Sequence, residues 1–115
     1  MSRYKNGLFA EYYAALFLFL KGYRVLVMRY KTKVGEVDII ARRKNTIVFI
    51  EVKYRKDRLI GGDAISPKSQ SRIRRAAEYY MMKNQNESNI IDCELRMDAM
   101  IVTHKLFIHH IKNAF

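Results

Sequence analysis

The feature that most constrains this chain is a pair of short runs rich in β-branched and aromatic residues, separated by a three-residue polar break. The runs span Val34–Arg42 and Thr46–Tyr54. This pattern predicts two antiparallel strands joined by a tight turn at Lys44-Asn45. A turn of that length sets the register of the hairpin, because every residue of one strand then has a defined partner on the other.

The predicted register brings acidic residues together, with Asp38 opposite Glu51 and Glu36 opposite Lys53. Opposed residues have Cβ atoms about 4.5 to 5.5 Å apart, so the carboxylates of Asp38 and Glu51 repel unless a cation or a proton lies between them. A divalent ion held by these carboxylates, water and a substrate phosphate suits Mg²⁺ or Mn²⁺, which prefer oxygen ligands. Lys53 would stabilise the charge that develops on the phosphate. We therefore predict a catalytic metal site here.

The common alternative for a Glu-x-Lys triplet is a solvated strand face. The apolar run Ile47–Ile50 precedes Glu51, and Val52 follows it. This context favours a central strand, on which a charged face needs a functional reason. For Glu36, a salt bridge with Lys53 is the simpler interpretation.

A third carboxylate lies in a predicted first helix, which runs from Arg3 to Lys21 and ends before Gly22. Glu11 shares one stripe of that helix with the apolar residues Leu8, Ala15 and Leu18. A carboxylate on an apolar stripe is costly unless it has a partner. Glu11 is therefore either a third residue of the metal site or the partner of a nearby Arg or Lys.

The remaining segments complete an α/β pattern, in which a sheet packs against helices. We expect a strand at Tyr23–Tyr30, a loop at Asp57–Ile65, a helix from Ser66-Pro67 to about Asn84, and one or two strands within Ile90–Thr103 and Leu106–Ile111. The length of 115 residues and the hydrophobic content of 50% fit a single domain spanning residues 1–115.

The chain is strongly basic, with 22 Lys and Arg against 11 Asp and Glu and a formal net charge of +11. Such a field attracts polyanions, so nucleic acid is the expected partner, although an anionic membrane surface attracts the same charge. Cys93 is the only cysteine, which excludes an intrachain disulfide and favours the cytoplasm. The apolar run Ala14–Leu20 is too short to span a membrane.

Several cations are candidates for contacts with nucleic-acid phosphates. Lys68, Arg72 and Arg75 recur at helical spacing, and Arg55 and Lys56 extend the basic surface beyond the Glu-x-Lys strand. The alternative is a solvated helix face. His104, His109 and His110 are expected at structural or exposed positions, and Asp98 in the Arg-Met-Asp triplet is expected either to orient a basic residue or to support the fold.

Segments spread along the chain together resemble a known family. They are Gly35–Ala41, Phe49–Arg55, Lys68 with Arg72 and Arg74–Ala77, Arg96–Asp98, and His110–Phe115. In these segments the chain resembles the YraN-like family of small bacterial proteins, which is similar to archaeal Holliday junction resolvases and to the PD-(D/E)xK nuclease superfamily. The resemblance covers nearly the whole chain, and Val37 departs from the Pro of the superfamily motif.

The resemblance implies a restriction-endonuclease-like core, with a central mixed β-sheet flanked by helices. It also implies that Asp38 and Glu51 are metal ligands, that Lys53 is the catalytic lysine, and that Glu11 assists the metal. The expected activity is Mg²⁺-dependent cleavage of DNA, with branched or junction DNA favoured and a homodimer expected for a two-fold symmetric junction. Two alternatives stay open: a non-catalytic nucleic-acid-binding module of the same fold, and a basic adaptor for another protein or an anionic membrane.

Overall fold

The computed structural model describes residues 3–55, 65–87 and 89–115, with side chains from residue 7 onward. In these ranges the chain forms an α/β fold of two α-helices and a five-stranded sheet. The elements are α1 (Arg3–Leu20), β1 (Arg24–Lys31), β2 (Glu36–Arg43), β3 (Thr46–Arg55), α2 (Pro67–Lys83), the 3₁₀ turn η2 (Ile90–Asp92), β4 (Glu94–Thr103) and β5 (Ile108–Ile111). Most of the predicted loop at 57–65 lies outside the described residues.

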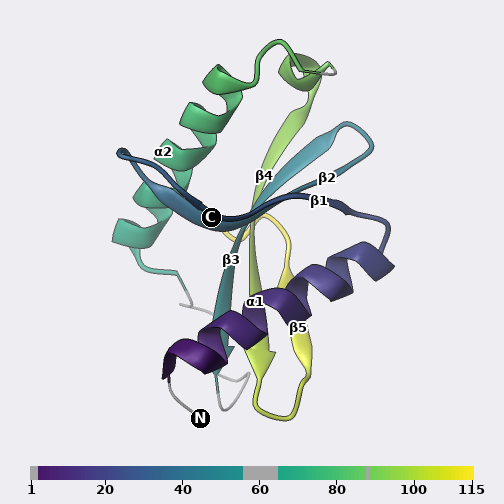
Figure 1. Ribbon diagram of the computed structural model, residues 1–115, viewed down its shortest axis with the longest axis vertical. Helices are drawn as coiled ribbons and strands as arrows, with labels where there is room; N and C mark the ends of the chain where they lie inside the picture. The colour runs from purple at the N-terminus through teal and green to yellow at the C-terminus, as the bar shows by residue number, and fades with distance from the viewer. Residues whose placement is uncertain (1–2, 56–64, 88) are drawn as a thin grey trace.

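The sheet has the strand order β1-β2-β3-β4-β5 (Figure 1). β3 and β4 are parallel, whereas the other neighbouring strands are antiparallel. A parallel pair needs a long crossover connection, and α2 lies in that connection between β3 and β4. The predicted mixed sheet is therefore confirmed, and β3 is its central strand.

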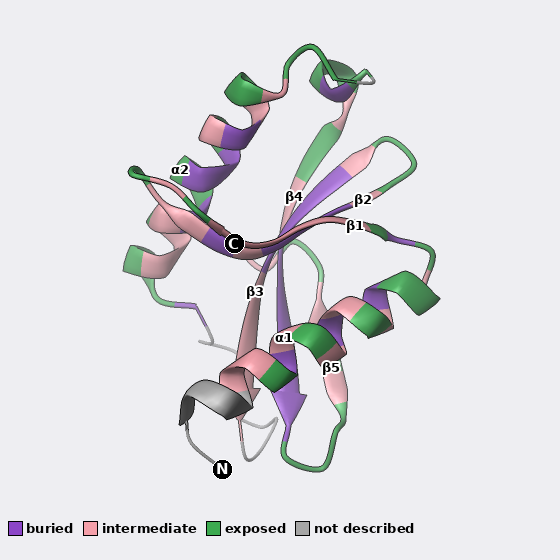
Figure 2. Ribbon diagram, viewed as in Figure 1, coloured by how far each residue is buried: buried purple, intermediate pink, exposed green. Residues whose placement is uncertain are grey.

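The two helices cover opposite faces of the sheet (Figures 1 and 2). Alternate residues of β3 show this arrangement, because Ile47 and Phe49 pack with α2 residues while Val48 and Ile50 pack with α1 residues. β3 is thus buried on both faces as far as Ile50. The charged residues that follow Ile50 on the same strand therefore stand out.

The ends of the helices follow signals in the sequence. Gly22 comes after α1 with a φ of +91°, the left-handed conformation in which many helices end. Ser66 caps α2 by accepting a hydrogen bond from the Ser69 backbone N–H at 3.2 Å, and Pro67 is the first helical residue. Both helices therefore begin or end as predicted.

β4 and β5 begin later than the sequence predicted. Ile90–Asp92 forms a 3₁₀ turn after Asn89, whose φ is 57°, so β4 begins at Glu94. Leu106 has a φ of 67°, so β5 begins at Ile108. In both places a left-handed residue turns the chain out of the extended conformation.

α1 is apolar along most of its length. Its inner side is buried against the sheet at Ala10, Ala14 and Leu18. Its outer side exposes large apolar side chains, namely Phe9, Tyr12, Leu16, Phe19 and Leu20. No helix in the described part of the chain is both long enough and apolar enough to cross a membrane.

Candidate active site

The sheet opens beside Asp38. β2 and β3 pair in the predicted register as far as Ile39 and Ile50. No pair forms between them beyond this point, although β2 continues to pair with β1 as far as Glu36. Instead, Oδ2 of Asp38 accepts a hydrogen bond from the Val52 backbone N–H at 2.8 Å. Asp38 therefore lies at a fork, where its carboxylate takes the place of a strand-to-strand hydrogen bond.

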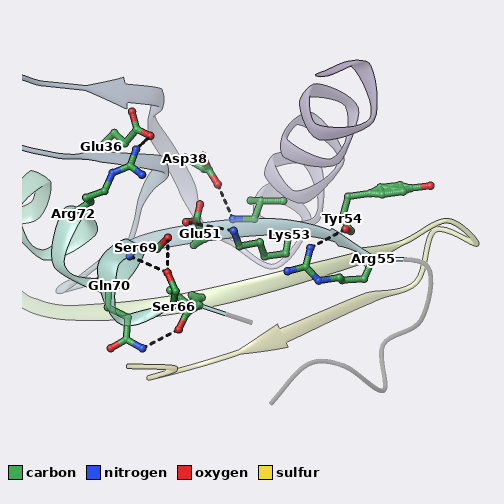
Figure 3. A network of polar contacts seen from close by, with 12 residues as sticks. Glu36, Asp38, Glu51, Lys53, Tyr54, Arg55, Ser66, Ser69, Gln70 and Arg72 are labelled. Carbon is green, nitrogen blue, oxygen red and sulfur yellow. Dashed lines mark hydrogen bonds and ion pairs between the residues drawn. The ribbon is translucent and has the colours of Figure 1, made fainter. Parts of the chain in front are cut away.

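A small pocket lies at this fork, between the sheet and the first turns of α2 (Figure 3). Its volume is about 30 Å³, room for roughly one or two water-sized groups. The residues that line it come from β2, β3 and α2: Glu36, Val37, Asp38, Glu51, Ser69, Arg72 and Ile73. The fork thus places Asp38 and Glu51 in the same pocket.

The surroundings of Glu51 favour its protonated form. Burial, a hydrogen bond with Asp38 and the charge of Asp38 together raise the pKa of Glu51 to about 9, against the opposing charges of Lys53 and Arg72. Only 16% of the Glu51 side chain is exposed. Two carboxyl groups that share a proton form a site that a divalent cation can enter, because the cation replaces the proton and balances both charges.

Lys53 lies beside Glu51, with its Nζ 4.0 Å from Oε2 of Glu51. The sequence placed Lys53 opposite Glu36, and that prediction is wrong. Because β2 and β3 no longer pair at this level, Glu36 lies across from Lys31 on β1 and forms a salt bridge with Arg72 of α2. In Figure 3 the Glu36–Arg72 pair lies apart from the Glu51–Lys53 pair.

Glu11 approaches the site from α1. Its side chain is 14% exposed, and its Oε1 lies 3.8 Å from Nε of Arg29 on β1. Oε1 is buried and accepts no hydrogen bond from the described residues. Burial and the charge of Asp38 raise the pKa of Glu11, whereas Arg29 and Lys31 lower it. Glu11 therefore has a nearby Arg partner, as the second of its two predicted roles expected, and its pKa also responds to the charge of Asp38.

The donor atoms at the fork suit a hard divalent cation. Asp38 and Glu51 offer only carboxylate oxygens, the ligands that Mg²⁺ and Mn²⁺ prefer. Among the described residues, no three His, Cys, Asp or Glu side chains are close enough together to hold a metal ion by themselves. Mg²⁺ commonly takes one or two carboxylates and keeps several water ligands. Asp38 and Glu51 are thus the two residues that could hold the ion, while Glu11 could accept a hydrogen bond from a bound water.

Two of the residues predicted to contact nucleic acid, Arg72 and Arg75, also support the fold. Arg72 forms its salt bridge with Glu36, and Nε of Arg75 donates to the Val34 backbone oxygen at 2.7 Å. Both contacts tie α2 to the β1–β2 hairpin. Gly35 in that hairpin permits the close approach, because an added Cβ would overlap the backbone oxygen of Arg72.

The other three cations predicted to contact nucleic acid lie near the pocket in sequence. Lys68 is exposed on the first turn of α2, next to Ser69 of the pocket wall. Arg55 ends β3, two residues beyond Lys53, and is partly buried. Lys56 lies outside the described residues.

A buried polar network holds the C-terminal part of the sheet together. Asp98 on β4 is fully buried and accepts hydrogen bonds from Arg96 at 3.0 Å, from His110 at 2.7 Å and from the Asn113 backbone N–H at 3.0 Å. Arg96 also donates to the Tyr23 hydroxyl at 2.6 Å. Burial favours a higher pKa for Asp98, but the hydrogen bonds from His110 and Arg96 hold it below its usual range. The expectation that Asp98 supports the fold is confirmed; the sequence signal was an Arg and an Asp on one strand face.

Comparison with known proteins places the chain in a family. The family described as "Uncharacterised protein family UPF0102" matches residues 10–102. A UPF0102 protein of Rhodopseudomonas palustris is 41% identical over 115 residues, which cover 100% of this chain and 86% of the relative. Those of Agrobacterium fabrum and Rhizobium etli are 41% and 39% identical over 111 residues, which cover 96% of this chain and 88% of each relative. The chain therefore belongs to the uncharacterised family UPF0102.

Proposed function

We propose that this UPF0102 protein is a metal-dependent endonuclease that hydrolyses phosphodiester bonds in DNA. The observation that carries the proposal is the fork, where Asp38 and Glu51 from adjacent strands line one pocket beside Lys53. A buried pair of acids destabilises the fold unless a proton or a cation separates them. A divalent cation would balance the negative charges of Asp38 and Glu51, and a phosphate would balance the positive charge of Lys53.

The architecture supports the same proposal. Glu51 and Lys53 lie on the central strand of a mixed sheet with helices on both faces. This is the arrangement expected for a restriction-endonuclease-like core, and the resemblance to the PD-(D/E)xK nucleases assigns the metal to the same acids. In this proposal the catalytic groups Asp38, Glu51 and Lys53 lie at the fork.

Each residue of the fork has a task in the proposed reaction. A bound Mg²⁺ or Mn²⁺ would supply Lewis acidity toward the phosphate and acidify a water molecule. Asp38 and Glu51 hold this ion through carboxylate oxygens. Lys53 stabilises the negative charge that develops on the phosphate oxygens. Glu11 does not line the pocket but feels the charge of Asp38, and its buried Oε1 would accept a hydrogen bond from a water bound to the ion.

The substitution Asp38→Asn separates the enzyme from its main alternative, a nucleic-acid-binding module of the same fold. An asparagine oxygen can still accept the hydrogen bond from the Val52 N–H, so the fork is retained while the charge is removed. We expect the cleavage rate to fall by about 100-fold or more, because a metal ligand is weakened. DNA affinity and thermal stability should change little.

The assay compares wild type, Asp38→Asn and Glu94→Gln on nicked, flapped and four-way DNA with Mg²⁺ or Mn²⁺. Glu94 is exposed and lies across from Thr46, at the opposite end of the β3–β4 pair from the pocket, so Glu94→Gln should cleave like wild type. Wild-type protein that binds these DNAs but leaves all of them intact would overturn the enzyme and favour the binding module. Weak DNA binding even at low salt would favour an adaptor for another protein or for an anionic membrane.

Branched DNA is the substrate that the proposal favours. A four-way junction with two-fold symmetry requires two active sites related by that symmetry, which calls for a homodimer. The exposed apolar side chains on the outer side of α1 offer a surface that a second copy could cover. Sedimentation of the purified protein alone and with a four-way junction measures this association.

A further inference from the structure

Arg29 has an unusual backbone conformation in the middle of β1. Its φ is 54°, in the left-handed region that non-glycine residues rarely adopt. The other described non-glycine residues with positive φ lie outside the helices and strands: Lys44, Asn89, Leu106 and Asn113. Strained backbone of this kind persists where the surrounding structure holds it, and it is common at functional sites.

The left-handed residue switches the faces of β1. In a regular strand Met28 and Tyr30 would lie on the same face. Here Met28 packs in the core under α1, whereas Tyr30 packs on the α2 side in an edge-to-face contact with Tyr80. The change of face at Arg29 turns its guanidinium toward α1, where its Nε lies 3.8 Å from Oε1 of Glu11.

The switch occurs at the level of the fork. β1 and β2 pair at Met28–Ile39 and at Tyr30–Val37, so Arg29 and Asp38 lie between these two pairs. β2 changes face at the same level, because Ile39 packs on the α1 side and Val37 on the α2 side. The irregularity in β1 is therefore matched by one in β2 at Asp38.

Glu11 depends on a cation in this position. Its Oε1 is buried and accepts no hydrogen bond from the described residues, and 3.8 Å from Arg29 is too long for one. The guanidinium therefore acts on Glu11 through its charge, opposing the burial and the Asp38 charge that disfavour the carboxylate. Arg29 thus forms the ion pair between β1 and the helix carboxylate, and the charge of Lys31 on the same strand adds a smaller effect.

We propose that Arg29 is a positioning residue for Glu11: its left-handed backbone turns the guanidinium onto the Glu11 carboxylate and holds that carboxylate beside Asp38. The inference rests on the proposed nuclease function, to which it adds a residue outside the pocket. It also explains the strained conformation. An extended residue at this position would point to the α2 side of the sheet, away from Glu11.

The test replaces Arg29 with glycine, which adopts positive φ without strain. Arg29→Gly should change the melting temperature little, because relief of the backbone strain offsets the loss of the ion pair with Glu11. Its kcat should nevertheless fall by about 10-fold or more, as is usual when the partner of a site carboxylate is removed. KM for DNA should stay the same. Arg29→Asn, which also tolerates this conformation, repeats the test if the glycine loosens β1.

Lys44→Gly is the matched control. Lys44 is also a cation with positive φ, at 55°, but it lies in the β2–β3 turn at the far end of β2. Its replacement should raise or keep the melting temperature and leave kcat unchanged. A raised KM with unchanged kcat in Arg29→Gly would make Arg29 a DNA contact and would overturn the inference.

A double-mutant cycle tests the contact without using activity. Glu11→Gln should raise the melting temperature more in the Arg29→Gly background than in wild type, because the carboxylate loses its neutralising partner there. Additive changes would overturn the inference even in a protein that cleaves DNA. If the two substitutions have non-additive effects on the melting temperature but the protein cleaves no DNA, the proposed function is wrong while the Arg29–Glu11 contact is supported.

Discussion

At the scale of single residues, the fork is a place where folding and chemistry make opposing demands. Glu51 is buried next to another acid, and its carboxylate form is disfavoured in the folded protein. Asp38 is held in place because its Oδ2 accepts the Val52 N–H. Asp38 is thus fixed by a backbone hydrogen bond, and the neighbouring Glu51 is neutral because its pKa is raised. A divalent cation would stabilise this pair of acids.

This pair predicts an unusual pH dependence of stability for the metal-free protein. Glu51 keeps its proton in the folded state until the pH reaches about 9, whereas in the unfolded chain it loses the proton near its ordinary value of 4.5. Between these values the folded state binds one more proton, so the free energy of unfolding falls as pH rises, by up to about 1.4 kcal/mol per pH unit. Glu51→Gln does not titrate and should lack this contribution.

Urea unfolding with a chelator present, at several pH values within this window, measures the slope. Glu78→Gln, at an exposed position of α2, is the control and should keep the wild-type slope. Equal slopes for wild type and Glu51→Gln would mean that Glu51 is already ionised in the folded protein. Addition of Mn²⁺ should reduce the wild-type slope, because the ion takes the place of the proton.

At the scale of elements, the pocket depends on the way the β1–β2 hairpin docks against α2. Gly35 has no room for a side chain, because an added Cβ would overlap the Arg72 backbone oxygen and would lie 2.9 Å from the Ala76 nitrogen. The contacts of Arg72 with Glu36 and of Arg75 with the hairpin backbone lie around this point. The hairpin therefore sets the position of the helix that forms one wall of the pocket.

Gly35→Ala should disrupt this docking. Forcing a methyl group against helix backbone costs about 2 kcal/mol or more of unfolding free energy, since backbone atoms cannot give way as a flexible side chain can. Cleavage should fall as well, because Ser69 and Arg72 of the pocket wall move with α2.

Gly7→Ala provides the control from the other helix. No atom lies within 4 Å of a Cβ added at Gly7 in α1, so the alanine should stabilise the helix by about 0.5 to 1 kcal/mol. Denaturant midpoints measure both changes. A Gly35→Ala protein as stable as wild type would show that the hairpin and α2 can separate without cost.

At the scale of the whole molecule, the net charge of +11 draws a polyanion toward the chain, but individual cations have different tasks. Arg72 and Arg75 bind partners within the fold. Lys68 is exposed beside the pocket wall. The electrostatic grip on DNA should therefore come more from cations such as Lys68 than from every basic residue of α2.

Lys68→Ala and Arg75→Ala should consequently have different effects. Removing one phosphate contact lowers the steepness of the salt dependence of DNA binding by about one unit, which we expect for Lys68→Ala with unchanged stability. Arg75→Ala should instead lower the unfolding free energy by about 1 kcal/mol through its lost hydrogen bond. Binding titrations at several salt concentrations, together with unfolding curves, measure both. The reverse pattern would contradict these assignments.

Much of this architecture could be predicted from the sequence, because it depends on interactions between near neighbours. Strand alternation and the two-residue turn at Lys44-Asn45 determined the hairpin and its register up to Ile39. Ser66-Pro67 and Gly22 marked helix ends through their own backbone preferences. The same short-range geometry brought Asp38 and Glu51 close together, although they line one pocket rather than forming a pair in the sheet.

The tertiary structure alone decided what happens where the strands separate. Three features depend on α1 and α2 packing against opposite faces of the sheet. They are the fork at Asp38, the salt bridge of Glu36 with Arg72 in place of the predicted Lys53, and the change of face at Arg29. Glu36 and Arg72 are 36 residues apart, so no local pattern could reveal their contact. Local backbone preferences and strand alternation were enough to predict the strands and the acids on them. The contacts that orient those acids form only when elements distant in the sequence pack together.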